Sequence, residues 1–283
     1  MNWLLPALLA ATLDGAKNLY AKHLTKTFDE YLLAFTTAIT AVAILLPLVA
    51  WIGIPDIQTG FTQALIITSA INAITLVLVL KALKHTDVSL AIPLFSLSPA
   101  FLLITSPLII GETPGIIGIA GVALILAGAY ALNFKKHVNL QPLKEILTNR
   151  GQRLILIVTL LWAISSNYYK LGMQNSSPTF FILALYLTIT VLLIPFILQK
   201  NRLATTKKHW KQLAPLGILT ATTSIFQWLA ASMTLVVYAL SIKRLSILIA
   251  VIGGAILFKE PATKQRVLAT LILLSGVLLI TLA

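Results

Sequence analysis

Residues 31–51 read YLLAFTTAITAVAILLPLVAW and contain no charged side chain. A run of about 20 apolar residues is long enough to cross a bilayer as one helix, because each helical residue advances about 1.5 Å through a hydrocarbon core about 30 Å thick. A membrane strand would be shorter and would alternate polar with apolar positions. The stretch therefore predicts a transmembrane helix.

Similar apolar runs recur along the whole chain. We expect ten membrane-spanning helices, at residues 3–23, 31–51, 61–83, 88–111, 114–134, 154–173, 179–198, 213–236, 238–258 and 267–283. The breaks between them are short and polar, apart from two long basic stretches at 135–153 and 200–211. The expected fold is an all-α membrane protein without a separate soluble domain.

The composition of the 283-residue chain agrees, with 58% hydrophobic and only 10% charged residues. An ordinary globular domain carries about 25% charged residues, so lipid must replace water over most of this surface. The net charge of +13 would suggest nucleic acid in a soluble chain. Here the basic residues lie mainly in loops, where they orient a membrane protein, so we expect the lipid bilayer and no nucleic acid as a partner.

The basic residues gather on one side of the expected membrane. The loops after the first, third, fifth, seventh and ninth expected helices, with adjoining helix ends, hold 18 of the 21 Lys and Arg residues. The exceptions are Lys170, Lys243 and Arg244. The positive-inside rule makes that side cytoplasmic, which predicts a multi-pass protein of a prokaryotic cell membrane with both termini outside.

An internal repeat emerges when the chain is shifted by 148 positions. The shift aligns Glu112 with Glu260, Leu126 with Leu274, Gly128 with Gly276, and Ala91 with Ala239. The chain then divides into a five-helix half at 1–134, a basic connector at 135–153 and a second five-helix half at 154–283. Because five is odd, the second half enters the membrane in the opposite sense, which predicts an inverted-topology repeat of the kind found in secondary transporters.

Several motifs resemble the EamA-type transporters of the drug/metabolite transporter superfamily. They are TDVSLAIPL at 86–94, LSPAF at 97–101, LIIGE at 108–112 and LWAISSNYYKLG at 161–172. The resemblance implies ten helices around a central cavity and the export or exchange of small metabolites. The first span, with LDGAKNLYAK at 13–22, also resembles small multidrug resistance transporters, in which the matching acid binds the cation and the proton.

Asp14 is the one acidic residue well inside an expected span. An ionised carboxylate at that depth costs at least about 2.5–3.5 kcal/mol, so it should face a cavity or a partner. Lys17 and Asn18 follow at i+3 and i+4, where a pair would simply neutralise the charge. The other interpretation makes all three residues substrate contacts and Asp14 the candidate for proton coupling.

Two adjacent cations, Lys243 and Arg244, lie five or six residues inside the ninth expected helix. Their long stems would let them reach the membrane interface. Alternatively, they hold an anion inside the cavity, and Arg244 suits that role because a guanidinium binds carboxylate or phosphate bidentately. Both interpretations stay open.

Further polar and aromatic residues interrupt the apolar spans and are candidates for lining a pocket, although aromatic residues at helical spacing often only pack. They are Asn72, Trp162, Ser166, Tyr169, Gln227 and Trp228. Glu112 and Glu260 each end an apolar run just before a new helix, with proline one or two residues later. We expect them to cap that next helix, where a carboxylate satisfies free N–H groups.

No catalytic constellation is present, since the chain contains no HExxH, GxSxG or GxxxxGK[ST] pattern, and it has no cysteine. We therefore expect no catalytic residue, metal or cofactor, and no enzyme. The leading hypothesis is a secondary exporter or exchanger of a small amphipathic metabolite or drug, as a monomer or homodimer. A flippase for a lipid-linked head group is the alternative, ahead of a channel or an intramembrane enzyme.

Overall fold

The computed structural model describes residues 3–110, 116–132, 141–199, 202–233, 242–261 and 263–281. Within these ranges the regular elements are all helical. The long helices are α1 (Leu4–Leu24), α2 (Glu30–Ile52), α3 (Phe61–His85), α6 (Ile116–Leu132), α8 (Arg150–Gln174), α9 (Pro178–Leu198), α10 (Arg202–Met233) and α13 (Thr263–Thr281). The shorter ones are α4 (Val88–Ala91), the 3-10 helix η1 (Pro93–Leu97), α5 (Ser98–Ile110), α7 (Gln141–Thr148) and α12 (Ser246–Phe258).

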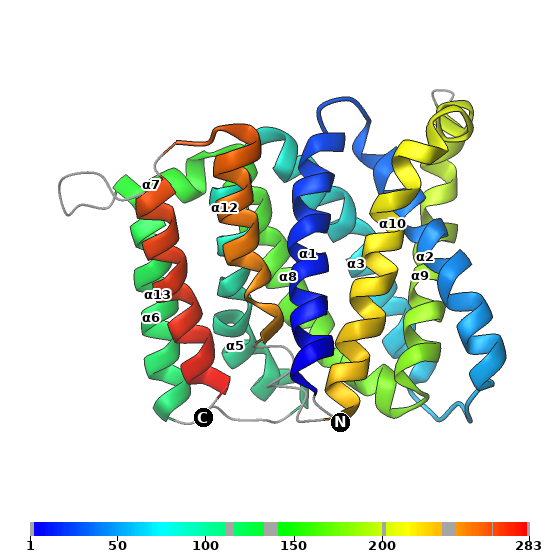
Figure 1. Ribbon diagram of the computed structural model, residues 1–283. Coiled ribbons are helices and arrows are strands. Elements are labelled where there is room, and N and C mark those ends of the chain that lie inside the picture. Colours follow the sequence, from blue (N-terminus) through cyan, green and yellow to red (C-terminus); the bar gives the residue numbers. More distant parts are fainter. Residues whose placement is uncertain are drawn as a thin grey trace.

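The helices run side by side, and both chain ends lie at the same edge of the molecule (Figure 1). The α1–α2 turn, α7 and the α12–α13 turn lie at the opposite edge (Figure 1). Among the described helices, four are long and apolar enough to cross a membrane by themselves: α2, α3, α8 and α9. The all-α membrane fold is confirmed, while the number of ten spans stays a prediction.

The fourth expected span is not one continuous helix. It is divided into α4, η1 and α5, with Pro93 opening the 3-10 turn. Proline has no N–H to donate, and its ring clashes with the preceding turn of an α-helix, so the chain changes direction there. The ninth expected span is also interrupted, because Arg244 and Leu245 form a turn just before α12 begins at Ser246.

Two stretches expected as loops contain helix. The connector at 135–153 includes α7 and the first turn of α8, which starts at Arg150 after the Asn149 side chain caps the N–H of Gln152. The basic stretch at 200–211 includes the start of α10. His209 is the non-helical point inside α10, with φ −112° and ψ 18°, so the basic and apolar parts of α10 meet at a kink.

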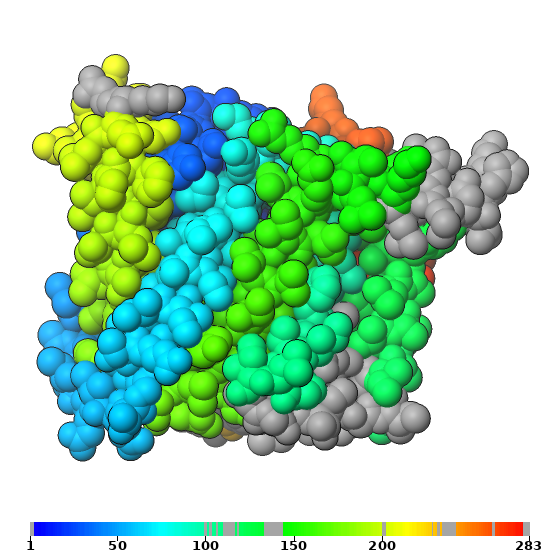
Figure 2. All heavy atoms as spheres, turned by 180° about the vertical axis from the view of Figure 1, so that it is seen from behind, coloured from blue at the N-terminus to red at the C-terminus, as the bar shows by residue number. Residues whose placement is uncertain are grey.

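The two halves contact each other in matching pairs. The contacts of α1 with α10 and of α3 with α8 are equivalent under the repeat, as are those of α1 with α12 and of α8 with α5. Figure 2 shows α3 and α8 side by side on the back of the molecule. Helices α6 and α13 are counterparts of each other, and they also pack together.

Glycines make the α6–α13 contact close. A Cβ on Gly128 would lie 2.7 Å from Cγ of Leu273, and a Cβ on Gly276 would lie 2.8 Å from Cγ1 of Ile125. Each residue of the second contact is 148 positions from a residue of the first. The sequence repeat therefore corresponds to a repeat of the packing, as expected if the halves are related by an approximate two-fold axis.

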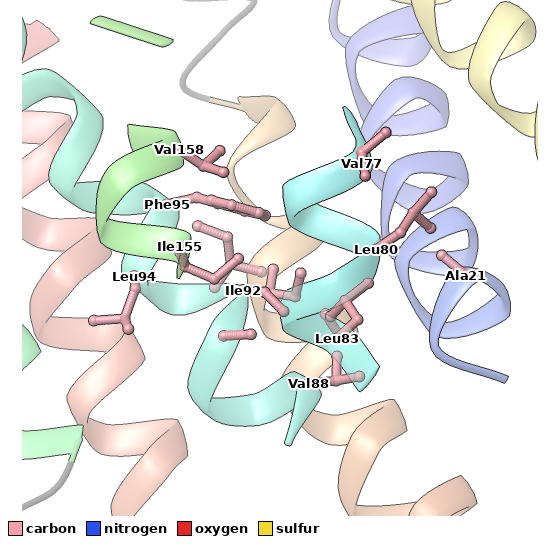
Figure 3. Close-up of a cluster of buried hydrophobic side chains, with 14 of the residues drawn as sticks. Ala21, Val77, Leu80, Leu83, Val88, Ile92, Leu94, Phe95, Ile155 and Val158 are labelled. Atoms are coloured by element: carbon pink, nitrogen blue, oxygen red, sulfur yellow. The ribbon is translucent and has the colours of Figure 1, made fainter. Parts of the chain in front are cut away.

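The breaks in the fourth and ninth spans are counterparts as well. Helix α5 runs from Ser98 to Ile110, and α12 runs from Ser246 to Phe258, so their first and last residues are 148 positions apart. Buried side chains fix the first break: Ile92 and Phe95 lie between α3 and α8, with Leu83 and Ile155 nearby (Figure 3). This packing positions the start of α5 in the interior.

Candidate functional site

A cavity of about 390 Å³ lies between the two halves. Its size falls within the range of about 300–1,000 Å³ that is usual for small-molecule sites. Helices α1, α2, α3, η1, α8, α9 and α10 contribute to its walls, together with the starts of α5 and α12. The predicted substrate-binding residues that line it are Asp14, Lys17, Asn18, Asn72, Trp162, Ser166, Tyr169, Lys243 and Arg244.

Two predicted residues differ in placement. Gln227 does not line this cavity, and its Oε1 atom is buried without a hydrogen-bond partner among the described residues. The side chain of Trp228 lies outside the part of the chain whose side chains are described. The predicted role of both residues stays untested.

Asp14 forms the short-range pair that its spacing predicts. Nζ of Lys17 donates to Oδ1 of Asp14 at 2.5 Å, and Nδ2 of Asn18 reaches Oδ2 at 3.5 Å. The side chains of Asp14 and Lys17 are 13% and 25% exposed. The pair neutralises the acid and also faces the cavity, so the two interpretations of Asp14 are compatible.

Arg244 lies in a short turn before α12, and Lys243 lies in helical conformation directly before that turn, so the ninth expected helix is not continuous at this point. Both line the cavity. No hydrogen bond or ion pair joins either side chain to another residue in the described part of the chain. Asp14 is an electrostatic neighbour of both. The described lining of the cavity thus includes one acidic side chain, Asp14, and three basic ones, since Lys17 is the third cation.

The aromatic side chains that α8 contributes to the cavity are held in place by specific contacts. Nε1 of Trp162 donates to Oγ1 of Thr75 at 3.1 Å, and the Trp162 ring packs on Phe95 with centroids 4.8 Å apart. Nδ2 of Asn72 donates to Oγ of Ser165 at 2.8 Å. The rings of Tyr169 and Phe181 pack edge to face, with centroids 5.0 Å apart. These bonds fix the orientation of the aromatic rings before any solute enters.

Equivalent positions of the two halves both line the cavity. The pairs are Asp14 with Trp162, Lys17 with Ser165, Asn18 with Ser166, Ala21 with Tyr169, Thr37 with Leu185, Asn72 with Thr220, Phe95 with Lys243, and Ser98 with Ser246. Each pair is separated by 148 residues, and both members line the cavity. The α1 side carries charges, whereas the α8 side carries aromatic rings and hydroxyl groups. Ser165, Phe95, Ser98 and Ser246 were not predicted, although applying the repeat to Asp14 and Lys17 would have found the first.

Glu260 caps α4 of the opposite half, a contact that was not predicted, and its expected role at the start of α13 stays a prediction. Its carboxylate accepts the N–H of Val88 at 2.8 Å, the N–H of Ser89 at 2.9 Å, and the hydroxyl of Ser89. Nη1 of Arg266 donates to Oδ2 of Asp87 at 2.9 Å and lies 3.7 Å from Oε2 of Glu260. We call Asp87, Ser89, Glu260 and Arg266 the latch. Glu112, the counterpart of Glu260, lies outside the described residues.

The described residues contain no cluster of His, Cys, Asp or Glu that could hold a metal ion. Helical membrane proteins with a polar cavity between two repeated halves form a well-known class of transporters, and the fold and cavity fit that class. The chain belongs to the EamA-like transporter family, whose sequence model matches residues 1–134 and again 149–282. The resemblance inferred from the motifs is thereby confirmed, and the chain is an integral membrane protein of a transporter family.

Solved structures support the same fold. One crystal structure of another protein matches with a TM-score of 0.60 and 14% sequence identity, over 96% of this chain and 96% of that chain. At this identity the likeness shows the fold alone. No curated protein matches the chain at a significant level.

Proposed function

We propose that this protein is a secondary transporter that exports or exchanges a small amphipathic metabolite or drug through the cavity between its halves. The observation that carries the proposal is the cavity itself, which has a charged α1 side and an aromatic α8 side at equivalent positions. A solute with one charged end and one apolar end would contact both sides. The sequence has no phosphate-binding loop for ATP, so a gradient or a second solute supplies the energy.

The charge of the cavity favours a solute that carries a negative group. Lys243 and Arg244 add two cations to the balanced Asp14–Lys17 pair. Helices α5 and α12 both begin beside the cavity, at Ser98 and Ser246, and the first turn of a helix has a positive potential. Discontinuous helices that direct their first turns at an anionic substrate group are a known arrangement in transporters.

Movement of one half against the other would open the cavity to each side of the membrane in turn. The latch supports this, because Asp87 and Ser89 belong to the first half and Glu260 and Arg266 to the second. Nζ of Lys22 also donates to the carbonyls of Leu83 and Thr86, beside the latch, at 2.5 and 2.7 Å. An alternating-access cycle of ten helices in two inverted five-helix halves would break the bonds of the latch in one of its two states.

Asp14 is the residue we assign to proton coupling. Protonation of its carboxylate would remove the charge that neutralises Lys17 and is near Lys243 and Arg244. The binding of an anionic solute would therefore depend on whether Asp14 carries a proton. This dependence is what a proton-coupled carrier requires.

The basic edge of the molecule is the cytoplasmic side in this proposal, with both termini outside a prokaryotic cell membrane. The working unit in this proposal is a monomer or a homodimer. An alkaline phosphatase fused after Ala283 should be active in cells, and a green fluorescent protein there should stay dark. The reverse pattern would contradict the orientation.

The proposal is tested by a thermal-shift screen of the purified protein against amino acids, nucleosides, sugar phosphates and organic cations. A ligand that binds the native state raises its stability, so the effective class should then support counterflow in liposomes. The rival function, a flippase for a lipid-linked head group, predicts that only a lipid-linked compound is effective. No exchange of any soluble solute would favour it.

A further inference from the structure

A second cavity, of about 560 Å³, lies apart from the one between the halves and shares no lining residue with it. Its walls come from η1, α5, α6, α7 and α8, and the described lining residues are apolar except for Tyr130. Three of its lining side chains are more than half exposed: Ile104 at 63%, Leu126 at 53% and Leu147 at 55%. The cavity is therefore a groove that opens on the outside of the helix bundle, where acyl chains surround a membrane protein.

Helix α7 covers one end of this groove. Ile146 is only 5% exposed and Leu147 also lines the groove, so the short helix presents these two residues to α6 and α8. Its position at the edge of the bundle, beyond the end of α6, is that of an interfacial helix (Figure 1). The groove thus runs from the membrane interface into the hydrocarbon region.

Cations flank the covered end. Lys144 is exposed and lies one turn before Leu147 on the same face of α7, and Arg153 is exposed and lies one turn before Leu156 on α8. Arg150 is a third exposed cation, and Glu145 is the one acid among residues 141–153. The polar end of the groove is therefore positively charged, whereas its walls are hydrocarbon.

We propose that the groove binds one anionic phospholipid, with an acyl chain between α5 and α6 and the phosphate near Lys144 and Arg153. A soluble metabolite does not fit, because the walls offer almost no polar partner. A zwitterionic lipid would fill the groove equally well but would gain little from the cations. The site goes beyond the transport proposed above, and it lies on the α6–α8 side that Figure 2 shows from behind.

The test is the melting temperature of the purified protein in a non-ionic detergent with three additives: dioleoylphosphatidylglycerol, dioleoylphosphatidylcholine and sodium phosphate. We expect phosphatidylglycerol to raise the melting temperature by several degrees, phosphatidylcholine to raise it less, and phosphate alone to leave it unchanged. In a lipid titration, each cation removed should weaken the apparent affinity for phosphatidylglycerol about fivefold. Equal shifts with both lipids, or a full shift with phosphate alone, would overturn the proposal.

Matched variants locate the site. K144Q/R153Q should lose the excess shift with phosphatidylglycerol, whereas K207Q/K208Q, which removes two exposed cations of α10, should keep it. Val122→Phe should narrow the groove and reduce the shift with either lipid, because Val122 lines it. An undiminished phosphatidylglycerol response in K144Q/R153Q would reject the head-group site, and one in Val122→Phe would reject the acyl-chain site.

Discussion

Asp14 and Trp162 occupy equivalent positions of the two halves, 148 residues apart, and both line the cavity between α1 and α8. A symmetric pore would place the same kind of side chain at both positions. Here one position holds an ion-paired carboxylate, and the equivalent position holds a ring that contacts Thr75 and Phe95. The helices repeat while the chemistry of the cavity does not, as an asymmetric solute would require.

The first prediction concerns the charge of the solute. Arg244→Gln should weaken the binding of anionic solutes about tenfold or more, because a hydrogen bond to a charged group contributes about 1.5–3 kcal/mol. Neutral solutes should be affected much less. Lys208→Gln, which removes an exposed cation of α10 away from the cavity, is the control. Thermal-shift titrations measure both affinities, and an unchanged anion affinity in Arg244→Gln would remove that residue from the site.

The second prediction concerns coupling at Asp14. Asp14→Asn keeps the size of the side chain but removes its ionisation, so uptake driven by a pH gradient should disappear. The variant leaves Lys17 without its 2.5 Å partner and should melt lower than the wild type, whereas D14N/K17M should recover part of that loss. Gradient-driven uptake that persists in Asp14→Asn would transfer the coupling role to Glu112 or Glu260, or would indicate a pure exchanger.

Much of the fold could be predicted from the sequence, because the bilayer determines both the length of the apolar runs and the side on which the basic residues lie. The cavity residues Asp14, Lys17 and Arg244 could also be predicted from the sequence. A charged side chain inside an apolar run is energetically costly, so it needs a partner or a function. The internal repeat could be recognised from a few identical residues. It aligns Gly128 with Gly276, and the two glycines make equivalent contacts in the structure.

The features that could not be predicted from the sequence depend on contacts between residues far apart in the chain. Glu260 stands before α13 in sequence, yet it caps α4, which is 171 residues away at Ser89, and no local pattern indicates that partner. The break before α5 was missed because Pro93 lies in a run without a charged residue, so composition hides the change of direction. Phe95 and Ser98 reach the cavity only because of that break.

The third prediction tests the glycine contact between α6 and α13. A methyl group on Gly276 would lie 2.6 Å from the backbone oxygen of Gly121, so Gly276→Ala must push the helices apart. We expect a loss of about 1–3 kcal/mol, which is typical of overpacking. Leu271→Ala, on the exposed side of α13, should change stability far less. Equal melting temperatures of Gly276→Ala and wild type would show that the contact is looser than described.

The fourth prediction tests the latch. The chain has no cysteine, so D87C/R266C carries the only two thiols. A short thiol-reactive cross-linker should join these positions, where the native side chains are 2.9 Å apart, and should stop transport until the link is reduced. Each single variant treated with the same reagent is the control. Full transport by completely cross-linked protein would show that the latch does not open during the cycle.

The most direct test of the central claim is counterflow of the solute identified by thermal shift, in liposomes that contain one of two variants. Ser166→Trp fills the cavity, since Ser166 lines it, whereas Leu160→Trp adds the same ring to an exposed position of α8 outside it. We predict that counterflow is abolished in Ser166→Trp and retained in Leu160→Trp, with both proteins folded. Undiminished counterflow in Ser166→Trp would contradict the claim that solutes pass through this cavity.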